Sequence, residues 1–370
     1  MPSDYPLPSS DPASLGFAAK PLEHLDRLIK QHIEEGRYPG AQIALARHGQ
    51  LALFRTYGDA KIEPAKIPAT NDTLFLLFSQ TKVLTSSAVW TLIEEGKLSF
   101  MDKVADHLPE FACRGKADIT LHQVMTHQGG FPSNSVTKAT WNDHSRMRAE
   151  VCDFGLDWTP GSKLQYHSQA AHLVQAMVIE AVTGRDYRDV IREKVIEPLG
   201  LDNDIYVGVP TQAQARCADI HAPEPRDNSP EYRAAGLPSG GGFATARGMA
   251  AFYQMLLGNG RLGNVRLFSP RLVAYVSRNH TGERPDEAMT GIPMHRGLGP
   301  HVRGESDRIR GLGTLGSPTT FGHGGVGSSY SWADPESGVS FTYITNYVYP
   351  DPWHSARLDR VANLVHAAID

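Results

Sequence analysis

Residues 75–84 read FLLFSQTKVL, and they place Ser79 and Lys82 three positions apart. Residues at this spacing share one face of a helix. A serine is a poor nucleophile until a base takes its proton, and a lysine is such a base when burial lowers its pKa. The apolar flanks would desolvate Lys82, and free backbone N–H groups at a helix start stabilise an anion. The stretch therefore predicts a nucleophilic serine with a lysine base.

The same pattern occurs a second time in the chain, as Ser135-Val-Thr-Lys138. This copy lies in a polar stretch after Gly129-Gly-Phe-Pro132 and has no apolar helix around it, so we predict a loop there. From the residues alone, a plainer interpretation of the first copy stays open. In that interpretation Ser79 caps a helix and Lys82 lies on the surface.

A tyrosine and another serine, in Tyr166-His167-Ser168, follow the segment Trp158-Thr-Pro-Gly161. A tyrosine near a lysine ammonium can have a lowered pKa and can relay protons. The alternative is a tyrosine packed in a turn. Tyr275-Val-Ser277 has the same letters, so the triplet by itself says little.

Two glycine-rich segments are further candidates for contact with a substrate. The glycines of His323-Gly324-Gly325 would let a substrate approach an edge strand that offers a backbone N–H to an oxyanion. An ordinary glycine-rich turn is the alternative. Ser239-Gly-Gly-Gly-Phe-Ala-Thr245 precedes a predicted helix, but no Gly-Lys-Ser/Thr ends it, which excludes a P-loop.

The composition is that of an ordinary globular protein. Of 370 residues, 41% are hydrophobic and 21% charged, and the formal net charge is 36 − 40 = −4. This balance indicates no basic face for nucleic acid, and no apolar run approaches the roughly 18 residues that span a bilayer. The N-terminus has no basic start and no apolar stretch typical of a secretory signal. We therefore expect a cytoplasmic protein with no nucleic-acid or membrane partner.

No metal or cofactor is expected either. The three cysteines, Cys113, Cys152 and Cys217, are far apart, which argues against a disulfide framework and a zinc site. His122 and His127 are five positions apart and would not face each other on a helix, and no His-Glu-x-x-His occurs. Gly311-Leu-Gly-Thr-Leu-Gly316 has the letters of a dinucleotide fingerprint but lacks the strand and helix it needs. No Gly-x-Ser-x-Gly occurs, which argues against an α/β-hydrolase.

Predicted strands lie near the two ends of the chain, and predicted helices lie mostly between them. The strands are residues 41–47, 51–55, 330–333 and 339–345, and the helices are about 22–35, 81–95, 119–125, 169–182, 248–257 and 356–368. The simplest architecture is α+β, with one antiparallel sheet built from both termini and flanked by terminal helices. A helical region is inserted between the two halves. The Pro- and Ser-rich residues 1–18 are expected to form a loose arm.

The order Ser79-x-x-Lys82, Tyr166-x-Ser168 and His323-Gly-Gly325 resembles the serine β-lactamase and penicillin-binding-protein superfamily. Within it, the chain looks most like the class C-like branch that includes family VIII carboxylesterases. The resemblance covers about residues 20–368 and includes further segments, namely residues 39–41, 119–132, 158–161, 198–201, 240–246 and 321–325. It implies a β-lactamase-like fold with an α/β domain (19–80 and 240–370), a mainly helical domain (81–239), an N-terminal arm (1–18) and a site between the domains.

The resemblance also implies roles for individual residues. Ser79 would be the acylated nucleophile, and Lys82 and Tyr166 would be the general base and proton shuttle, in an order that the family leaves open. The backbone N–H groups of Ser79 and Val326 would form the oxyanion hole. Substrate-facing positions would be Ser168, His323, Gly324, Gly325 and Asn134.

Two departures from the family pattern favour esters over β-lactams. His323 stands where β-lactamases usually have a lysine that holds the substrate carboxylate, and histidine is mostly neutral at pH 7. Ser168 stands where they usually have an asparagine that contacts the acyl amide. We expect a serine hydrolase of small-molecule esters, with short acyl chains as the family default. A β-lactamase, a D-aminopeptidase or DD-peptidase, an acyltransferase and an inactive binding protein remain alternatives, and the oligomeric state is open. Arg296 or Arg303 could supply the missing cation for an amidase.

Overall fold

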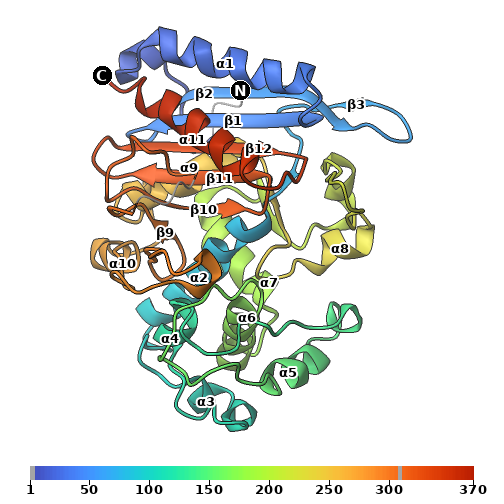
Figure 1. Cartoon of the computed structure of the whole chain (residues 1–370), viewed down its shortest axis with the longest axis vertical. Helices are drawn as coiled ribbons and strands as arrows, with labels where there is room; N and C mark the ends of the chain where they lie inside the picture. The colour runs from blue at the N-terminus through green and yellow to red at the C-terminus, as the bar shows by residue number, and fades with distance from the viewer. Residues whose placement is uncertain (1–4, 307–310) are drawn as a thin grey trace.

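The fold is organised around one antiparallel sheet whose central strands come from opposite ends of the chain (Figure 1). The computed structural model describes residues 5–306 and 311–370. Within these residues the sheet has the order β3-β2-β1-β12-β11-β10-β9. The strands are β1 (Gly40–Arg47), β2 (Gln50–Lys61), β3 (Ile67–Pro68), β9 (His301–Val302), β10 (Phe321–Gly325), β11 (Ser329–Asp334) and β12 (Val339–Thr345). Ala41 of β1 pairs with Thr345 of β12, which confirms the predicted assembly of the sheet from both termini.

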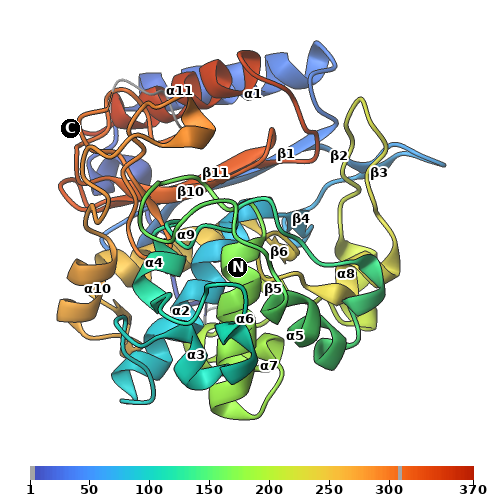
Figure 2. The same ribbon diagram turned by 60° about the horizontal axis from the view of Figure 1, so that its bottom comes forward.

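Helices cover both faces of this sheet. Alternate residues of a strand point to opposite faces, and in β1 Ile43 joins the apolar core on one side while Ala44 joins the core on the other. Helices α1 (Ala19–Glu34) and α11 (Trp353–His366) cover the first face, and α9 (Ala246–Leu257) packs on the second (Figure 2). Because both faces are covered, β1, β11 and β12 are buried along almost their whole length, and small polar residues such as Ser340 and Thr342 of β12 alternate with the apolar ones.

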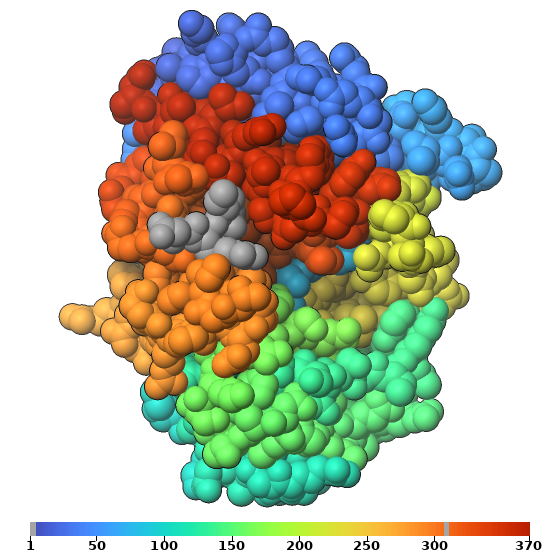
Figure 3. All heavy atoms as spheres, viewed as in Figure 1, coloured from blue at the N-terminus to red at the C-terminus, as the bar shows by residue number. Residues whose placement is uncertain are grey.

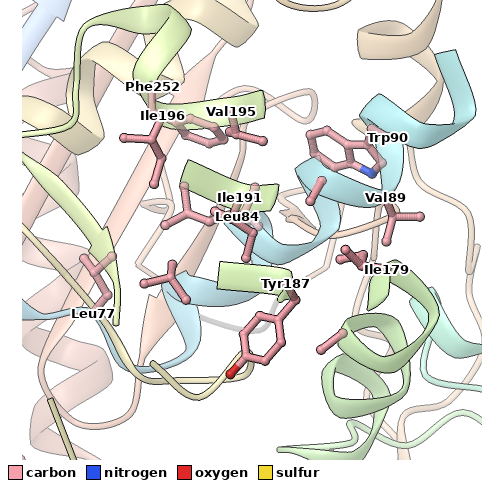
Figure 4. Close-up of a cluster of buried hydrophobic side chains, with 14 of the residues drawn as sticks. Leu77, Leu84, Val89, Trp90, Ile179, Tyr187, Ile191, Val195, Ile196 and Phe252 are labelled. Atoms are coloured by element: carbon pink, nitrogen blue, oxygen red, sulfur yellow. The ribbon is translucent and has the colours of Figure 1, made fainter. Parts of the chain in front are cut away.

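The helical region below the sheet is built around α2 (Thr81–Glu94) and α6 (Ala170–Thr183), which pack on each other. Apolar side chains lie on all sides of α2, as expected for a helix in the middle of a core. Leu84, Val89 and Trp90 of α2 belong to the same buried cluster as Ile179 of α6 (Figure 4). The remaining helices are α3 (Val104–His107), α4 (Leu121–Met125), α5 (His144–Cys152), α7 (Tyr187–Ile191), α8 (Pro230–Ala235) and α10 (Pro270–Val276).

A second, three-stranded sheet in the order β4-β6-β5 was not expected from the sequence. It consists of β4 (Phe75–Leu76), β5 (Ile205–Val207) and β6 (Gly242–Ala244), and β7 (Arg261–Leu262) pairs with β8 (Val265–Arg266) elsewhere. Strands of two or three residues are too short to show a period in the sequence. Because β4 pairs with β6, the turn that carries Ser79 lies beside the glycine loop 239–245. The inserted region therefore contributes one strand, β5, as well as helices.

Short helical turns connect these elements. The 3₁₀ turns are Pro12–Leu15, Phe78–Gln80, Pro109–Ala112, Lys138–Thr140, Glu197–Leu199, Thr211–Arg216 and Glu287–Met289, and Arg192–Ile196 is a π-helical turn. Five of the six predicted helices match α1, α2, α4, α6 and α9 closely. The sixth, α11, begins three residues before the predicted Ala356.

The prediction of a loose N-terminal arm was wrong for residues 5–18, which pack on the sheet. Leu7 and Phe17 are buried. The backbone N–H of Leu51 donates to the carbonyl of Pro8 (2.9 Å), and that of Ser10 donates to the carbonyl of Leu51 (3.0 Å). Two apolar side chains in a Pro- and Ser-rich stretch were enough to anchor it. Residues 1–4 of the arm lie outside the described residues.

Candidate active site

Ser79 lies in the 3₁₀ turn Phe78–Gln80, between β4 and the start of α2. The preceding Phe78 has a φ of +48°, a conformation that a side chain of this size rarely adopts. The backbone N–H of Leu77 donates to the carbonyl of Gly242 (2.8 Å), and the Thr81 hydroxyl donates to the carbonyl of Phe78 (2.6 Å). Both ends of this strained turn are therefore held in place, and Ser79 is presented next to the helix start, as the sequence predicts.

Lys82 lies behind Ser79 and is fully buried. Its ammonium nitrogen Nζ donates to Ser79 Oγ (3.0 Å) and to the backbone carbonyls of Ser168 (2.7 Å) and Ser239 (2.7 Å). Burial, helped by the nearby Arg296 charge, lowers the pKa of Lys82 to about 7. A surface lysine, the plainer interpretation of the sequence, is excluded.

Tyr166 lies beside Ser79, and its hydroxyl hydrogen-bonds the serine side chain. Burial raises the pKa of Tyr166 to about 12, although this hydrogen bond and the Arg296 charge act in the opposite direction. Two cations lie near the aromatic ring, with Lys82 Nζ 5.3 Å and Arg296 Cζ 4.9 Å from its centroid. The three residues that the sequence singles out thus meet at one point.

A buried ion pair supports this arrangement from behind the tyrosine. Arg296 Nη2 donates to Asp286 Oδ2, and both side chains are almost completely buried. Asp286 Oδ1 also accepts from the backbone N–H of Tyr166 (3.4 Å). The sequence named Arg296 only as a possible cation for a substrate, and it gave no signal for Asp286, which lies in an irregular segment. Arg303 has a different place, since its guanidinium binds carbonyls of Gly313 and Ser306.

The segment His323–Val326 forms one wall of a cavity of about 240 Å³, which we call the Tyr166 cavity. It is lined by Ser79, Tyr166, Met289, Met294, Arg296, His301, His323, Gly324, Gly325, Val326 and His354. The His323 and His301 rings lie 4.0 Å apart, and His323 Nδ1 is 2.9 Å from the carbonyl of Gly324. Val326, just beyond the end of β10, is exposed on this cavity.

A second cavity of about 330 Å³ also borders Ser79, and we call it the Trp141 cavity. It is lined by Phe78, Ser79, Val136, Lys138, Trp141, Ser168, Gln169, Tyr232, Leu237, Ser239 and Gly240. Ser168 therefore contributes to the site in two ways. Its backbone carbonyl accepts from Lys82, and its exposed side chain lines this cavity. Figure 3 shows that this face of the molecule is hollowed between the sheet and the helical region.

The prediction that Asn134 faces the substrate was wrong. Its side-chain amide donates to the carbonyls of Phe131 (3.2 Å) and Gly155 (2.9 Å) and accepts from the backbone N–H of Gly155 (3.3 Å). These bonds use the amide to hold a loop, and Asn134 lines neither cavity. Phe131, in the same loop, is a buried core residue.

The serines of the two repeated patterns, Ser135 and Ser277, line neither cavity, although Val136 beside Ser135 lines the Trp141 cavity. Residues 135–137 lie in a loop as predicted, and Lys138 begins a 3₁₀ turn and lines the Trp141 cavity. Tyr275 and Ser277 belong to the end of α10. The local helix and its apolar flanks, rather than the letters, distinguish the functional copies.

Among the residues that the structure describes, one group could in principle hold a metal ion, namely His144, Glu180 and Asp186. His144 Nδ1 is 2.6 Å from Glu180 Oε1, and Asp186 pairs with the Arg188 guanidinium (2.6 Å). The carboxylates already have cationic or polar partners, so the group is accounted for as an ion-pair cluster on α5, α6 and α7.

This geometry is matched by similarity to a known protein family. The family model described as Beta-lactamase matches residues 25–366. The chain belongs to the beta-lactamase family. Its fold and its class, a serine hydrolase of β-lactamase fold, are those of the serine β-lactamase and penicillin-binding-protein superfamily, as the resemblance in the sequence indicates.

Similar members of this family carry different names. A "Putative D-alanyl-D-alanine carboxypeptidase" of Escherichia coli K12 is 28% identical, covering 92% of this chain and 86% of that protein. An "Esterase/beta-lactamase LipL" of Mycobacterium tuberculosis is 27% identical, covering 84% and 77%. The crystal structure of a family VIII carboxylesterase superposes with a TM-score of 0.83 at 27% identity, covering 95% of this chain and 99% of that one. No helix in residues 5–306 and 311–370 is long and apolar enough to cross a membrane.

Proposed function

We propose that this member of the beta-lactamase family hydrolyses carboxylic esters through an acyl-enzyme on Ser79. The observation that carries the proposal is the buried Lys82 amine, 3.0 Å from Ser79 Oγ and with a pKa of about 7. Near neutral pH a large share of the molecules has a neutral amine in this position. Such an amine accepts the serine proton directly.

The two shifted pKa values assign different roles in proton transfer to Lys82 and Tyr166. Lys82 is the base that activates Ser79, because Tyr166, with a pKa of about 12, keeps its proton at neutral pH. As the serine oxygen attacks, the carbonyl oxygen becomes an oxyanion, which the N–H groups of Ser79 and Val326 stabilise. Tyr166 then donates its proton to the departing alkoxide and regains one from the Lys82 ammonium. Water repeats the sequence on the acyl-enzyme and releases the acid.

Esters are favoured over anionic amides because a carboxylate already balances the charge of Arg296 and of Lys138, the Arg and Lys side chains that line the two cavities. Arg296 pairs with Asp286, and Lys138 pairs with Asp227 (2.9 Å). His323 stands where a β-lactamase would offer lysine, and burial beside Arg357 lowers the pKa of His354 to about 3. The carboxylesterase and esterase names among the similar proteins support the same substrate class.

An amidase of the DD-peptidase type is the second candidate. One observation favours it, because Arg296 lines the Tyr166 cavity beside Ser79, and its buried Nε and Nη1 atoms have no hydrogen-bond partner among the described residues and could donate to a substrate carboxylate. The name of the Escherichia coli relative points to the same reaction.

The test compares turnover of p-nitrophenyl butyrate, a chromogenic cephalosporin and a peptide ending in D-alanyl-D-alanine. Wild type is measured beside Ser79→Ala, with Ser135→Ala in the second copy of the pattern as the matched control. We expect ester turnover in wild type and in the control and none in Ser79→Ala. Faster turnover of the lactam or the peptide would place the amidase first, and ester turnover without Ser79 would overturn the proposal.

A further inference from the structure

The two cavities at Ser79 have different chemistry. Ser79 lines both, and the other lining residues given above for each cavity are different. The Tyr166 cavity contains Tyr166 and the end of β10, whereas the Trp141 cavity combines polar residues with five apolar or aromatic side chains from separate segments. These are Phe78, Val136, Trp141, Tyr232 and Leu237. An ester has two halves, and the structure offers a separate space for each.

The tetrahedral intermediate determines which half enters which space. Its carbon carries four substituents, namely Ser79 Oγ, the oxyanion, the leaving oxygen and the acyl chain. The oxyanion must lie at the N–H of Val326 and the leaving oxygen at the hydroxyl of Tyr166, and both residues line the Tyr166 cavity. Lys82 is sealed behind Ser79 and cannot protonate the alcohol itself. The remaining direction, toward the Trp141 cavity, is left for the acyl chain.

The walls of the Trp141 cavity are aromatic. The Trp141 and Tyr232 rings pack edge to face, with centroids 5.6 Å apart and planes at 62°. Both rings are only partly buried, so each keeps apolar surface that a ligand can cover. Lys138 Nζ lies 5.0 Å from the Trp141 ring while it pairs with Asp227. This ion pair ties the loop of Trp141 to the segment before α8, which carries Tyr232.

We propose that the Trp141 cavity is the acyl site and selects aromatic acyl groups such as phenylacetyl, while the alcohol leaves through the Tyr166 cavity. The inference rests on the proposed ester hydrolysis at Ser79. The cavity volume lies at the lower end of the roughly 300–1,000 Å³ typical of small-molecule sites. An aryl ring would meet three aromatic walls in the edge or offset arrangements that such rings prefer. This specificity differs from the short acyl chains that the resemblance implies.

The test is a pair of substrate series measured on the same enzyme variants. p-Nitrophenyl acetate and p-nitrophenyl phenylacetate differ only in the acyl group, and p-nitrophenyl acetate and 2-naphthyl acetate differ only in the alcohol. We expect wild type to favour phenylacetyl over acetyl by about tenfold or more in kcat/KM, as a well-filled apolar site can. Trp141→Ala should abolish this ratio, and Trp141→Phe should retain most of it. Met294→Ala, in the Tyr166 cavity, should instead change the ratio of the two alcohols.

Boronic acids give a second readout that needs no turnover. The boron accepts the Ser79 oxygen and becomes tetrahedral, and its carbon substituent takes the place of the acyl chain. Benzylboronic acid should inhibit more tightly than methylboronic acid, and Trp141→Ala should remove the difference. A Trp141→Ala variant that changes only the alcohol ratio would reverse the assignment, and a wild type that favours acetyl would overturn the aromatic class. Both failures leave the dependence on Ser79 intact, whereas turnover and inhibition without Ser79 would refute the proposed function itself.

Discussion

Lys82 donates hydrogen bonds to three acceptors, and none of them carries a formal negative charge. They are the Ser79 hydroxyl and the backbone carbonyls of Ser168 and Ser239. A carboxylate in their place would hold the pKa of the lysine high. Dipoles alone position the amine without fixing its proton, which is the state a general base needs.

A pH profile follows from this arrangement. Below about pH 7 Lys82 gains a proton and can no longer accept one, so log kcat/KM should fall with a slope of about one. It should level off above this value and stay level to about pH 9, because Tyr166 keeps its proton there. Initial rates with p-nitrophenyl butyrate between about pH 5 and pH 9 measure the profile. A flat profile across this range would contradict Lys82 as the base.

Substitution of Arg296 tests how far its positive charge lowers the pKa of Lys82. Removal of its charge should raise the pKa of Lys82, because the two like charges repel, and the acid limb should move to higher pH. Arg296→Met leaves the buried Asp286 carboxylate without its cationic partner, so we expect about 3–5 kcal/mol of lost stability. Arg296→Met with Asp286→Asn should recover most of that loss and still show the moved acid limb. An unchanged limb in the double variant would assign this ion pair a purely structural role.

The contrast between these residues shows what the sequence could reveal. Ser79, Lys82 and Tyr166 stand out because local spacing and apolar flanks carry a chemical meaning. Asp286 lies in an irregular loop, where no period exists and only the folded chain brings its carboxylate to Tyr166. The prediction for Asn134 was wrong for a related reason, since a polar side chain near a motif can hydrogen-bond a loop backbone as readily as a substrate.

Strand β10 meets the turn of Ser79 at very short range, and this approach depends on glycine. A Cβ on Gly325 would lie 2.6 Å from the carbonyl oxygen of Leu77 and 3.1 Å from Cβ of Phe78. Both atoms belong to the segment that holds Ser79. The N–H of Val326 follows directly in the chain, so the fit between β10 and this turn positions the proposed oxyanion hole.

Gly325→Ala should therefore push β10 and Ser79 apart. We expect a loss of about 10²–10³-fold in kcat, similar to the removal of one oxyanion donor, with a smaller change in KM. Gly155→Ala is the matched control, since a Cβ there meets no atom within 4 Å, and it should keep normal rates. Steady-state kinetics of the two variants provide the measurement. Equal kinetics in both would show that β10 can move without cost to the reaction.

Long helices and the strands of the main hairpins were predictable, and the small sheet was not. Helix α6 (Ala170–Thr183) is a long apolar run ended by Gly184, a signal that the sequence shows directly. The strands β4 and β6 have two and three residues, and they exist because distant segments meet. Their pairing nevertheless places the Ser79 turn beside the 239–245 loop, so an unpredicted element sets much of the site.

The N-terminal and C-terminal segments of the chain contact each other at several places. The backbone N–H of Ala18 donates to the carbonyl of Ala368 (2.8 Å), and α1 packs on α11. The hydroxyl of Tyr343 in β12 donates to that of Tyr38 (2.8 Å). The predicted assembly of one sheet from both termini explains why these segments meet, since β1 and β12 are neighbours at its centre.

Arg357 of α11 connects this terminal layer to the active site. Its guanidinium Nη2 donates to the carbonyls of Gly327 (3.2 Å) and Ser328 (2.8 Å), in the turn directly after Val326. The buried side chain also lies over aromatic rings from both ends of the chain, including those of Tyr38 and Trp353. A residue of the last helix thus holds the turn that carries the proposed oxyanion donor.

Arg357→Met should weaken both the terminal layer and catalysis, because two buried carbonyls each lose one of their two hydrogen-bond donors, at about 0.5–1.5 kcal/mol each. We expect a lower Tm together with a fall of about tenfold or more in kcat. Arg357→Lys should recover only part of either loss, because an ammonium cannot reproduce the planar contact with the rings. Thermal unfolding and steady-state kinetics on the same preparations separate the two effects. A variant with a lower Tm and an unchanged kcat would mean that the turn keeps its geometry without α11.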